Sequence, residues 1–233
     1  MADKHLSSQF DAELSHISTS VLEMGGVVES QVQQVIYALN QLSLETCDQV
    51  LAIEDKVNRM EVDLDHDVTS TMSRRQPTAR DLRLLVGVSR ITINLERAAD
   101  EVVTIAKRLK DVLREGPLPA ESYSELRLTL KMAADLLHNA LDGFARLDVA
   151  GSLAVLKGRE ALDAEHAGMT RKLLTYMMED PRTITSALNL MFLARAVERV
   201  AAHASNIAEA TVYVIKGADI RHTSEAERER IVQ

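Results

Sequence analysis

The stretch FDAELSHISTSVLEMGGVVESQVQQVIYALNQL, residues 10–42, determines the fold class. Its large apolar side chains follow one another at intervals of three or four residues, at Phe10, Leu14, Ile17, Val21, Met24, Val28, Val32, Val35, Leu39 and Leu42. Because an α-helix has about 3.6 residues per turn, such positions form one apolar stripe. The stretch therefore predicts a long amphipathic helix, in which Gly25 and Gly26 mark a bend or a close contact with another helix.

The same periodicity predicts five further helices, at residues 44–73, 77–114, 121–146, 149–178 and 181–216. Pro77 and Pro181 are placed just inside a helix start, where a missing N–H costs nothing, and Gly217 is a suitable C-terminal cap. With only 9 glycines and 4 prolines in 233 residues, the chain has too few turn residues for a sheet protein. We therefore predict an all-α fold of six long antiparallel helices.

The predicted helices fall into two related halves. Pro77 recurs as Pro181, and the segment Leu95-Glu96-Arg97 recurs as Val197-Glu198-Arg199. The segment 115–119, with two prolines and a glycine, is the clearest break between the halves. Long helices with short links pack as antiparallel bundles. We therefore predict two tandem three-helix bundles followed by a short tail, at residues 8–114, 117–217 and 218–233.

Composition and charge exclude several classes of function. The net charge is −8 and Lys and Arg form no dense cluster, so the protein is not expected to bind nucleic acid. The single cysteine, Cys47, excludes an intrachain disulfide, fits a reducing compartment and is interpreted as an ordinary small residue near a helix start. The sequence has no secretion signal and no uncharged apolar run of about 20 residues. These features predict a cytoplasmic protein.

The sequence also argues against catalysis. It contains no GxGxxG, GKS, GKT, GxSxG or CxxC motif. A ferritin-like di-iron centre needs paired ExxH motifs with further glutamates, and Glu13–His16 is the only ExxH pair. We therefore predict that the chain is not an enzyme.

Acidic residues gather on two of the predicted helices. The second helix carries Glu54, Asp55, Asn58, Glu61 and Asp65, of which positions 54, 58, 61 and 65 share one face. The third carries Glu96 and Asp100, one turn apart. Hard cations need several oxygen ligands from different elements, and two facing helices could supply them. A solvated acidic face, with arginines of the same two helices as ion-pair partners, is the alternative interpretation.

The order of motifs along the chain resembles the PhoU family. The segments that carry the resemblance are 174–184 (LTYMMEDPRTI), 198–209 (ERVAAHASNIAE), 213–222 (YVIKGADIRH), 74–83 (RRQPTARDLR) and 95–101 (LERAADE). The resemblance extends over about residues 6 to 222, and the order and spacing of the motifs are specific.

The resemblance implies a cytoplasmic homodimer of chains with two three-helix bundles. It implies partnership with the ATPase subunit of the phosphate ABC transporter and with a membrane sensor histidine kinase, whose repressing state such proteins support when phosphate is plentiful. Some family members also bind iron, zinc or other metals through E(D)xxxD motifs, one set per repeat. The alternative function is therefore a metal-dependent binding or buffering protein, although the adaptor function requires no cofactor.

The chain departs from the family pattern in its second repeat. In the first repeat Asp55, Glu96 and Asp100 keep the acidic residue types, so the resemblance implies a divalent or iron-type metal ion there. At the equivalent positions of the second repeat, Arg159 replaces Asp55 and Ala202 replaces Asp100. A guanidinium repels a cation, so we predict that the second repeat has lost any metal cluster.

Glu198 is the one carboxylate that remains of the second set. We predict that it forms an ion pair with Arg159 between helices. Arg97, Arg199 and Glu198 are candidate contacts for a partner protein, and a pair within one helix, such as Arg97 with Asp100, is the alternative for these arginines.

Overall fold

The computed structural model describes residues 8–115 and 120–232, which contain helices and turns but no strand. The helices are α1 (Ser8–Gln41), α2 (Leu44–Leu51), α3 (Glu54–Arg75), α4 (Ala79–Glu115), α5 (Ala120–Arg146), α6 (Val149–Glu179), the 3₁₀ turn η1 (Pro181–Thr183), α7 (Ile184–Lys216) and α8 (Glu225–Val232). Over these residues the predicted all-α class is confirmed. None of the helices combines the length and the apolar character needed to cross a bilayer.

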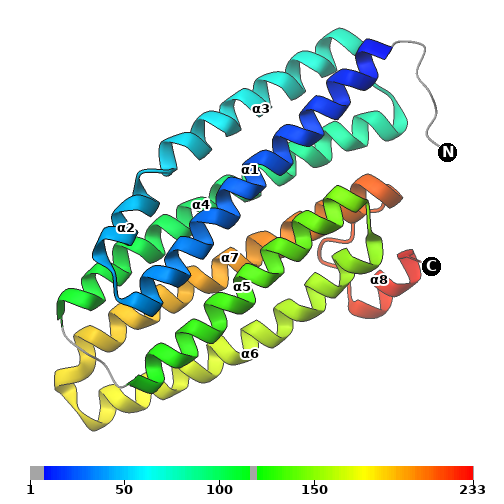
Figure 1. Ribbon diagram of the computed structural model, residues 1–233. Helices are drawn as coiled ribbons and strands as arrows, with labels where there is room; N and C mark the ends of the chain where they lie inside the picture. The colour runs from blue at the N-terminus through cyan, green and yellow to red at the C-terminus, as the bar shows by residue number, and fades with distance from the viewer. Residues whose placement is uncertain (1–7, 116–119, 233) are drawn as a thin grey trace.

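The helices form two bundles that lie side by side (Figure 1). The first contains α1 to α4 and the second contains α5 to α7, as the repeat in the sequence predicts. Among the described helix pairs, α4 and α7 make the most extensive contact, and α1 also packs against α5. The seam between the bundles is therefore built mainly from the last long helix of each repeat. Residues 116–119 of the predicted boundary lie outside the described part of the chain.

The prediction of one continuous second helix is wrong, because the segment is divided into α2 and α3. At the break, the Ile53 N–H donates to the Val50 carbonyl at 3.2 Å, with three-residue spacing in place of four. The buried amide of Gln31, on α1, donates to the same carbonyl at 3.5 Å. A side chain that bonds to a helix carbonyl in this way is a common cause of a helix interruption. The equivalent helix of the second repeat, α6, is continuous.

The prediction for Pro77 is also wrong, whereas Gly217 behaves as predicted. Gln76 ends α3 in the left-handed region with φ of 48°, and α4 begins only after Pro77 and Thr78. Pro181 lies in the first position of η1 as expected. Gly217 caps α7 with φ of 73°, a conformation that side chains with a Cβ rarely adopt.

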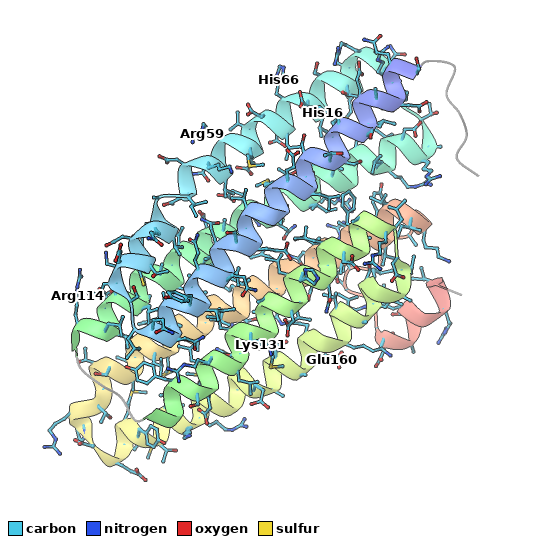
Figure 2. All side chains as sticks on the ribbon, in the orientation of Figure 1. His16, Arg59, His66, Arg114, Lys131 and Glu160 are labelled. Atoms are coloured by element: carbon cyan, nitrogen blue, oxygen red, sulfur yellow. The ribbon has the colours of Figure 1, made fainter. Side chains whose placement is uncertain are left out.

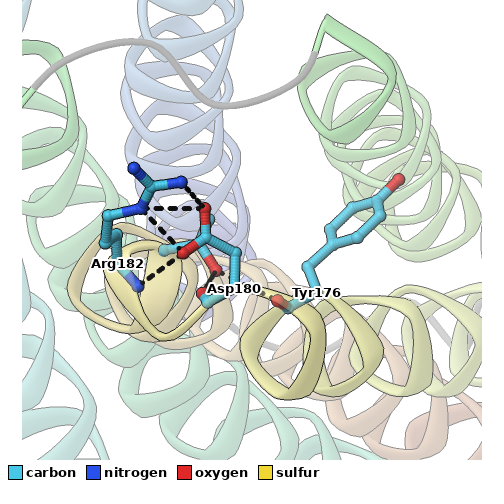
Figure 3. A network of polar contacts seen from close by, with 4 residues as sticks. Tyr176, Asp180 and Arg182 are labelled. Carbon is cyan, nitrogen blue, oxygen red and sulfur yellow. Dashed lines mark hydrogen bonds and ion pairs between the residues drawn. The ribbon is translucent and has the colours of Figure 1, made fainter.

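The start of the last long helix is held by Asp180 and its neighbours (Figure 3). The Asp180 carboxylate accepts hydrogen bonds from the backbone N–H and the guanidinium of Arg182, each at 3.0 Å to Oδ1. These bonds hold the pKa of Asp180 below its usual value. The Asp180 N–H in turn donates to the Tyr176 carbonyl at 3.0 Å, which ties η1 to the end of α6.

The predicted apolar stripe of α1 packs into one continuous hydrophobic core. Leu42 is the exception, because it lies in the turn after α1 and is exposed. A Cβ atom added to Gly25 would lie 2.6 Å from Leu141 Cδ2, so this glycine allows a close contact between α1 and α5. Cys47 is a buried thiol in the core, and burial raises its pKa.

A polar cluster fixes the register of α4 against α7. Asn94 Oδ1 lies 3.1 Å from His203 Nδ1 and accepts a hydrogen bond from Asn206 Nδ2 at 2.9 Å. Burial, followed by the positive charges of nearby arginines, lowers the pKa of His203 to about 4. The imidazole is therefore neutral at pH 7, and its Nδ1–H is the donor to Asn94. Sliding either helix by one turn would leave the buried His203 imidazole without this partner.

Candidate functional site

The structure brings three carboxylates of the first repeat together. Glu61, on α3, faces Glu96 and Asp100, on α4. Burial, followed by the charges of Asp100 and Glu61, raises the pKa of Glu96 to about 7. Burial, followed by the charges of Asp65 and Asp100, also raises the pKa of Glu61. Such mutual repulsion identifies a place where a proton or another cation is favoured.

Asp55 does not join this group. Its side chain is exposed and lines a shallow depression on α3 together with Asn58, Arg59, Val62 and Asp63. Figure 2 shows Arg59 on the outer side of this helix. The predicted set of Asp55, Glu96 and Asp100 is therefore divided between two faces of the bundle. Within residues 8–115 and 120–232, no three acidic, His or Cys side chains have an arrangement that would hold a metal ion.

The raised pKa of Glu96 gives a testable dependence of stability on pH. The usual pKa of Glu96 in the unfolded chain is 4.5, so between this pH and about 7 the folded protein keeps a proton on Glu96 that the unfolded chain releases. The folded state therefore loses stability as the pH rises through this range. We expect Glu96→Gln to unfold at a higher temperature than the parent at about pH 8 and at a similar temperature at about pH 5. Thermal unfolding followed by circular dichroism in the presence of a chelator measures this. An equal difference at both pH values would contradict the assignment.

The equivalent place in the second repeat is occupied by an internal cation. The guanidinium of Arg159, on α6, forms an ion pair with Glu198 Oε1, on α7, so the predicted pair is confirmed. Arg195 Nη1 lies 2.7 Å from Glu198 Oε2, and Arg159 Nε donates to Asp163 Oδ1 at 2.6 Å. The Glu198 side chain is only 11% exposed. Ala202 supplies no carboxylate, and the positive charges next to Glu198 come from Arg159 and Arg195.

The predicted partner contacts differ in accessibility. Arg97 is exposed on α4, and Arg199 is 53% exposed while its Nε donates to Glu101 Oε1 at 2.7 Å. This bridge joins α7 to α4 across the seam. Glu198 is covered by Arg159 and Arg195 and offers little surface to a partner. Of the three residues, the two arginines are the ones that another protein can reach.

Two contributors to this region are not among the residues that the sequence pattern indicates. One is Glu101, which follows Asp100 directly and forms the ion pair with Arg199. The other is the contact of Asn94 with His203 across the seam. The sequence feature that marks Asn94 and His203 is a polar side chain at a position that the helical period assigns to a packed face.

The ExxH motif does not form a metal site. Arg75 donates to both oxygens of Glu13, from Nη2 at 2.7 Å and from Nε at 3.0 Å, and these bonds lower the pKa of Glu13. His16 lies at the surface (Figure 2), with Nε2 at 3.6 Å from Asp67 Oδ2. The glutamate is therefore engaged in tying α1 to the end of α3.

Comparison with known proteins supports the same grouping of the helices. A family model described as the PhoU domain matches residues 21–109 and 126–211, one match in each bundle. A Burkholderia protein named phosphate-specific transport system accessory protein PhoU homolog is 40% identical over 225 residues, which are 96% of each chain. The Escherichia coli K12 protein named phosphate-specific transport system accessory protein PhoU is 37% identical over 232 residues, covering 99% of this chain and 95% of that one.

A solved structure agrees with these relatives. The crystal structure of PhoU from Pseudomonas aeruginosa is 39% identical in sequence and superposes with a TM-score of 0.87. The superposition covers 90% of this chain and 100% of the other. The family model matches both bundles, a relative aligns over 96% of the chain, and a crystal structure shares the arrangement of the helices. The chain therefore belongs to the PhoU family.

Proposed function

We propose that this protein is a cytoplasmic regulatory adaptor of phosphate homeostasis, which represses phosphate-starvation genes when phosphate is plentiful. As a homodimer, it acts by binding the ATPase subunit of the phosphate ABC transporter and a membrane sensor histidine kinase. One observation carries the proposal. Both bundles match the PhoU domain, and relatives that this chain covers almost completely are named as accessory proteins of the phosphate-specific transport system.

The PhoU family consists of accessory and regulatory proteins, and the chain is not an enzyme. An adaptor of this kind works by binding its partners in one signalling state and releasing them in another. A ligand shifts such an equilibrium only through its different affinity for the two states. The two bundles, joined along α4 and α7, provide a long helical surface for such binding.

The first test measures alkaline phosphatase in cells grown with abundant phosphate. We expect high activity when the gene is deleted and low activity when it is restored, because the adaptor holds the starvation response in its repressed state. A variant with a stop codon early in α1 is the matched control for restoration. Low activity in both the deleted and the restored strain would contradict the proposed function.

Metal-dependent binding at the first repeat is a second candidate, in which fewer than three protein side chains hold the ion and water completes its shell. It is favoured by the mutual repulsion of Glu61, Glu96 and Asp100, which a bound cation would relieve. We expect purified protein to lose bound divalent or iron-type metal in the double variant Glu96→Ala with Asp100→Ala. The control is Glu198→Ala in the second repeat, which should leave the metal content unchanged. Metal that is lost only in the control would contradict this candidate.

A further inference from the structure

One exposed line of side chains on α7 changes from apolar to basic along the helix. Ile184, Leu188 and Phe192 are 41%, 40% and 53% exposed. The same line continues with Arg195 and Arg199, which are 65% and 53% exposed. Their spacing of three and four residues places all five on one side of the helix. We call these five residues the α7 stripe.

The apolar end of the α7 stripe lies where α6 turns back into α7 (Figure 1). Leu174 and Met178, in the last turns of α6, are 46% and 86% exposed. Of the thirteen large apolar side chains that are exposed in the described chain, five therefore fall between residues 174 and 192. A concentration of this kind is typical of a surface that another molecule covers.

The stripe has a positive charge although the whole chain carries a net charge of −8. Residues 183–197 contain Arg195 and no acidic residue. The guanidinium of Arg108, on α4, lies 5.1 Å from the centre of the Phe192 ring. The acidic partners of Arg195 and Arg199 are only 11% and 13% exposed, so the arginines and not the carboxylates face the solvent.

We propose that the α7 stripe is the docking surface for an amphipathic helix of a partner protein, in which about two apolar turns are followed by Asp or Glu residues. The inference rests on the proposed function, because an adaptor needs a surface that recognises its partner. Side chains one turn apart along a single line match the spacing of a second helix, and the basic end selects acidic residues. Phenylalanine and arginine are both enriched at interfaces, and arginine is among the residues that dominate their binding energy.

The test uses purified full-length protein and labelled synthetic peptides of about 18 residues, above the length of about 12–15 residues below which isolated helices are marginal in water. The probe peptide carries Leu at helical spacing in one half and Glu in the other, and the control peptide has Lys in place of Glu. Fluorescence anisotropy should detect binding of the Glu peptide, weakened by added salt. We expect Leu188→Glu to weaken this binding about tenfold or more.

Two further variants make the test specific. Val62 is 66% exposed on α3, so Val62→Glu is a matched control that should leave the affinity unchanged. Arg195→Glu should weaken binding of the Glu peptide and favour the Lys peptide, because it reverses the charge at the basic end. Circular dichroism and thermal unfolding check that each variant is folded. Equal binding of both peptides by the parent protein, or unchanged affinity in Leu188→Glu, would overturn the inference.

Other occupants of the stripe give different results. If the parent binds vesicles of phosphatidylglycerol but neither peptide, the surface belongs to a membrane and the inference fails. If sedimentation shows self-association that Leu188→Glu abolishes, while the peptides do not bind, a second copy covers the stripe and the inference also fails.

The reporter assay separates this inference from the proposed function. We expect Leu188→Glu to leave phosphatase activity high in the deleted strain, whereas the parent and Val62→Glu lower it. If the parent and Leu188→Glu both restore repression, the docking surface is wrong while the adaptor function stands. If the parent itself does not restore repression, the proposed function fails. The α7 stripe is then tested by the peptide-binding assay alone.

Discussion

Arg159→Ala is expected to destabilise the protein by about 3 kcal/mol, because it leaves a largely buried carboxylate without its main partner. Glu198 is 11% exposed and Arg159 is 17% exposed. The remaining contact, with Arg195, comes from a side chain that is 65% exposed and is therefore weaker. Chemical denaturation of the parent and the variant measures the difference in the free energy of unfolding.

Two controls show whether burial of the charge is the cause. Arg146→Ala removes an arginine that is 74% exposed and pairs with Asp142 on the same helix, so it should cost less than about 1 kcal/mol. The double variant Arg159→Met with Glu198→Leu removes both buried charges and should recover most of the lost stability. A loss for Arg159→Ala no greater than that for Arg146→Ala would show that the pair is dispensable.

Gly87→Ala is expected to cost about 2 kcal/mol, although alanine favours helices by about 1 kcal/mol over glycine. A Cβ atom at residue 87 would lie 2.1 Å from Val214 Cγ2, in the seam between α4 and α7. Val214 is buried, and a valine in a helix has one strongly preferred rotamer, so the two helices have to move apart. The free energy of unfolding in urea measures the cost.

Gly26→Ala is the matched control for the seam glycine. Apart from its chain neighbours and the nearby backbone of its own helix, no atom lies within 4 Å of a Cβ added to Gly26, which is also inside a helix. The same substitution should therefore stabilise the protein by up to about 1 kcal/mol. If Gly87→Ala and Gly26→Ala both stabilise the protein, a Cβ atom at residue 87 fits between α4 and α7 and the prediction is wrong.

Features that repeat along the sequence could be predicted, and features that depend on helix rotation could not. The pairing of Arg159 with Glu198 could be predicted from the sequence, because the repeat aligns these positions with Asp55 and Glu96 of the first half. The helical period places Glu61 on the correct face with residues 54, 58 and 65, whereas Asp55 follows from the family pattern alone. Asp55 follows Glu54 by one residue, so it is rotated by about 100° from that face, and its short side chain is exposed.

The division of α2 from α3 has a different origin. It involves Gln31, a polar residue on another helix, and the carbonyl of Val50. Nothing in residues 44–73 interrupts the helical pattern strongly, since the segment contains neither proline nor glycine. A contact that a neighbouring helix imposes on the backbone is a tertiary effect, which local periodicity does not encode.

The register of the seam also affects how the protein is made on the ribosome. His203 and Asn94 are 109 residues apart, so the partner of α4 is synthesised long after α4 itself. At about 5–20 residues per second, the nascent first half waits roughly 5–20 s with the apolar side of α4 uncovered. We therefore expect the first half expressed alone to aggregate or to bind chaperones, and co-expression of the second half to rescue it.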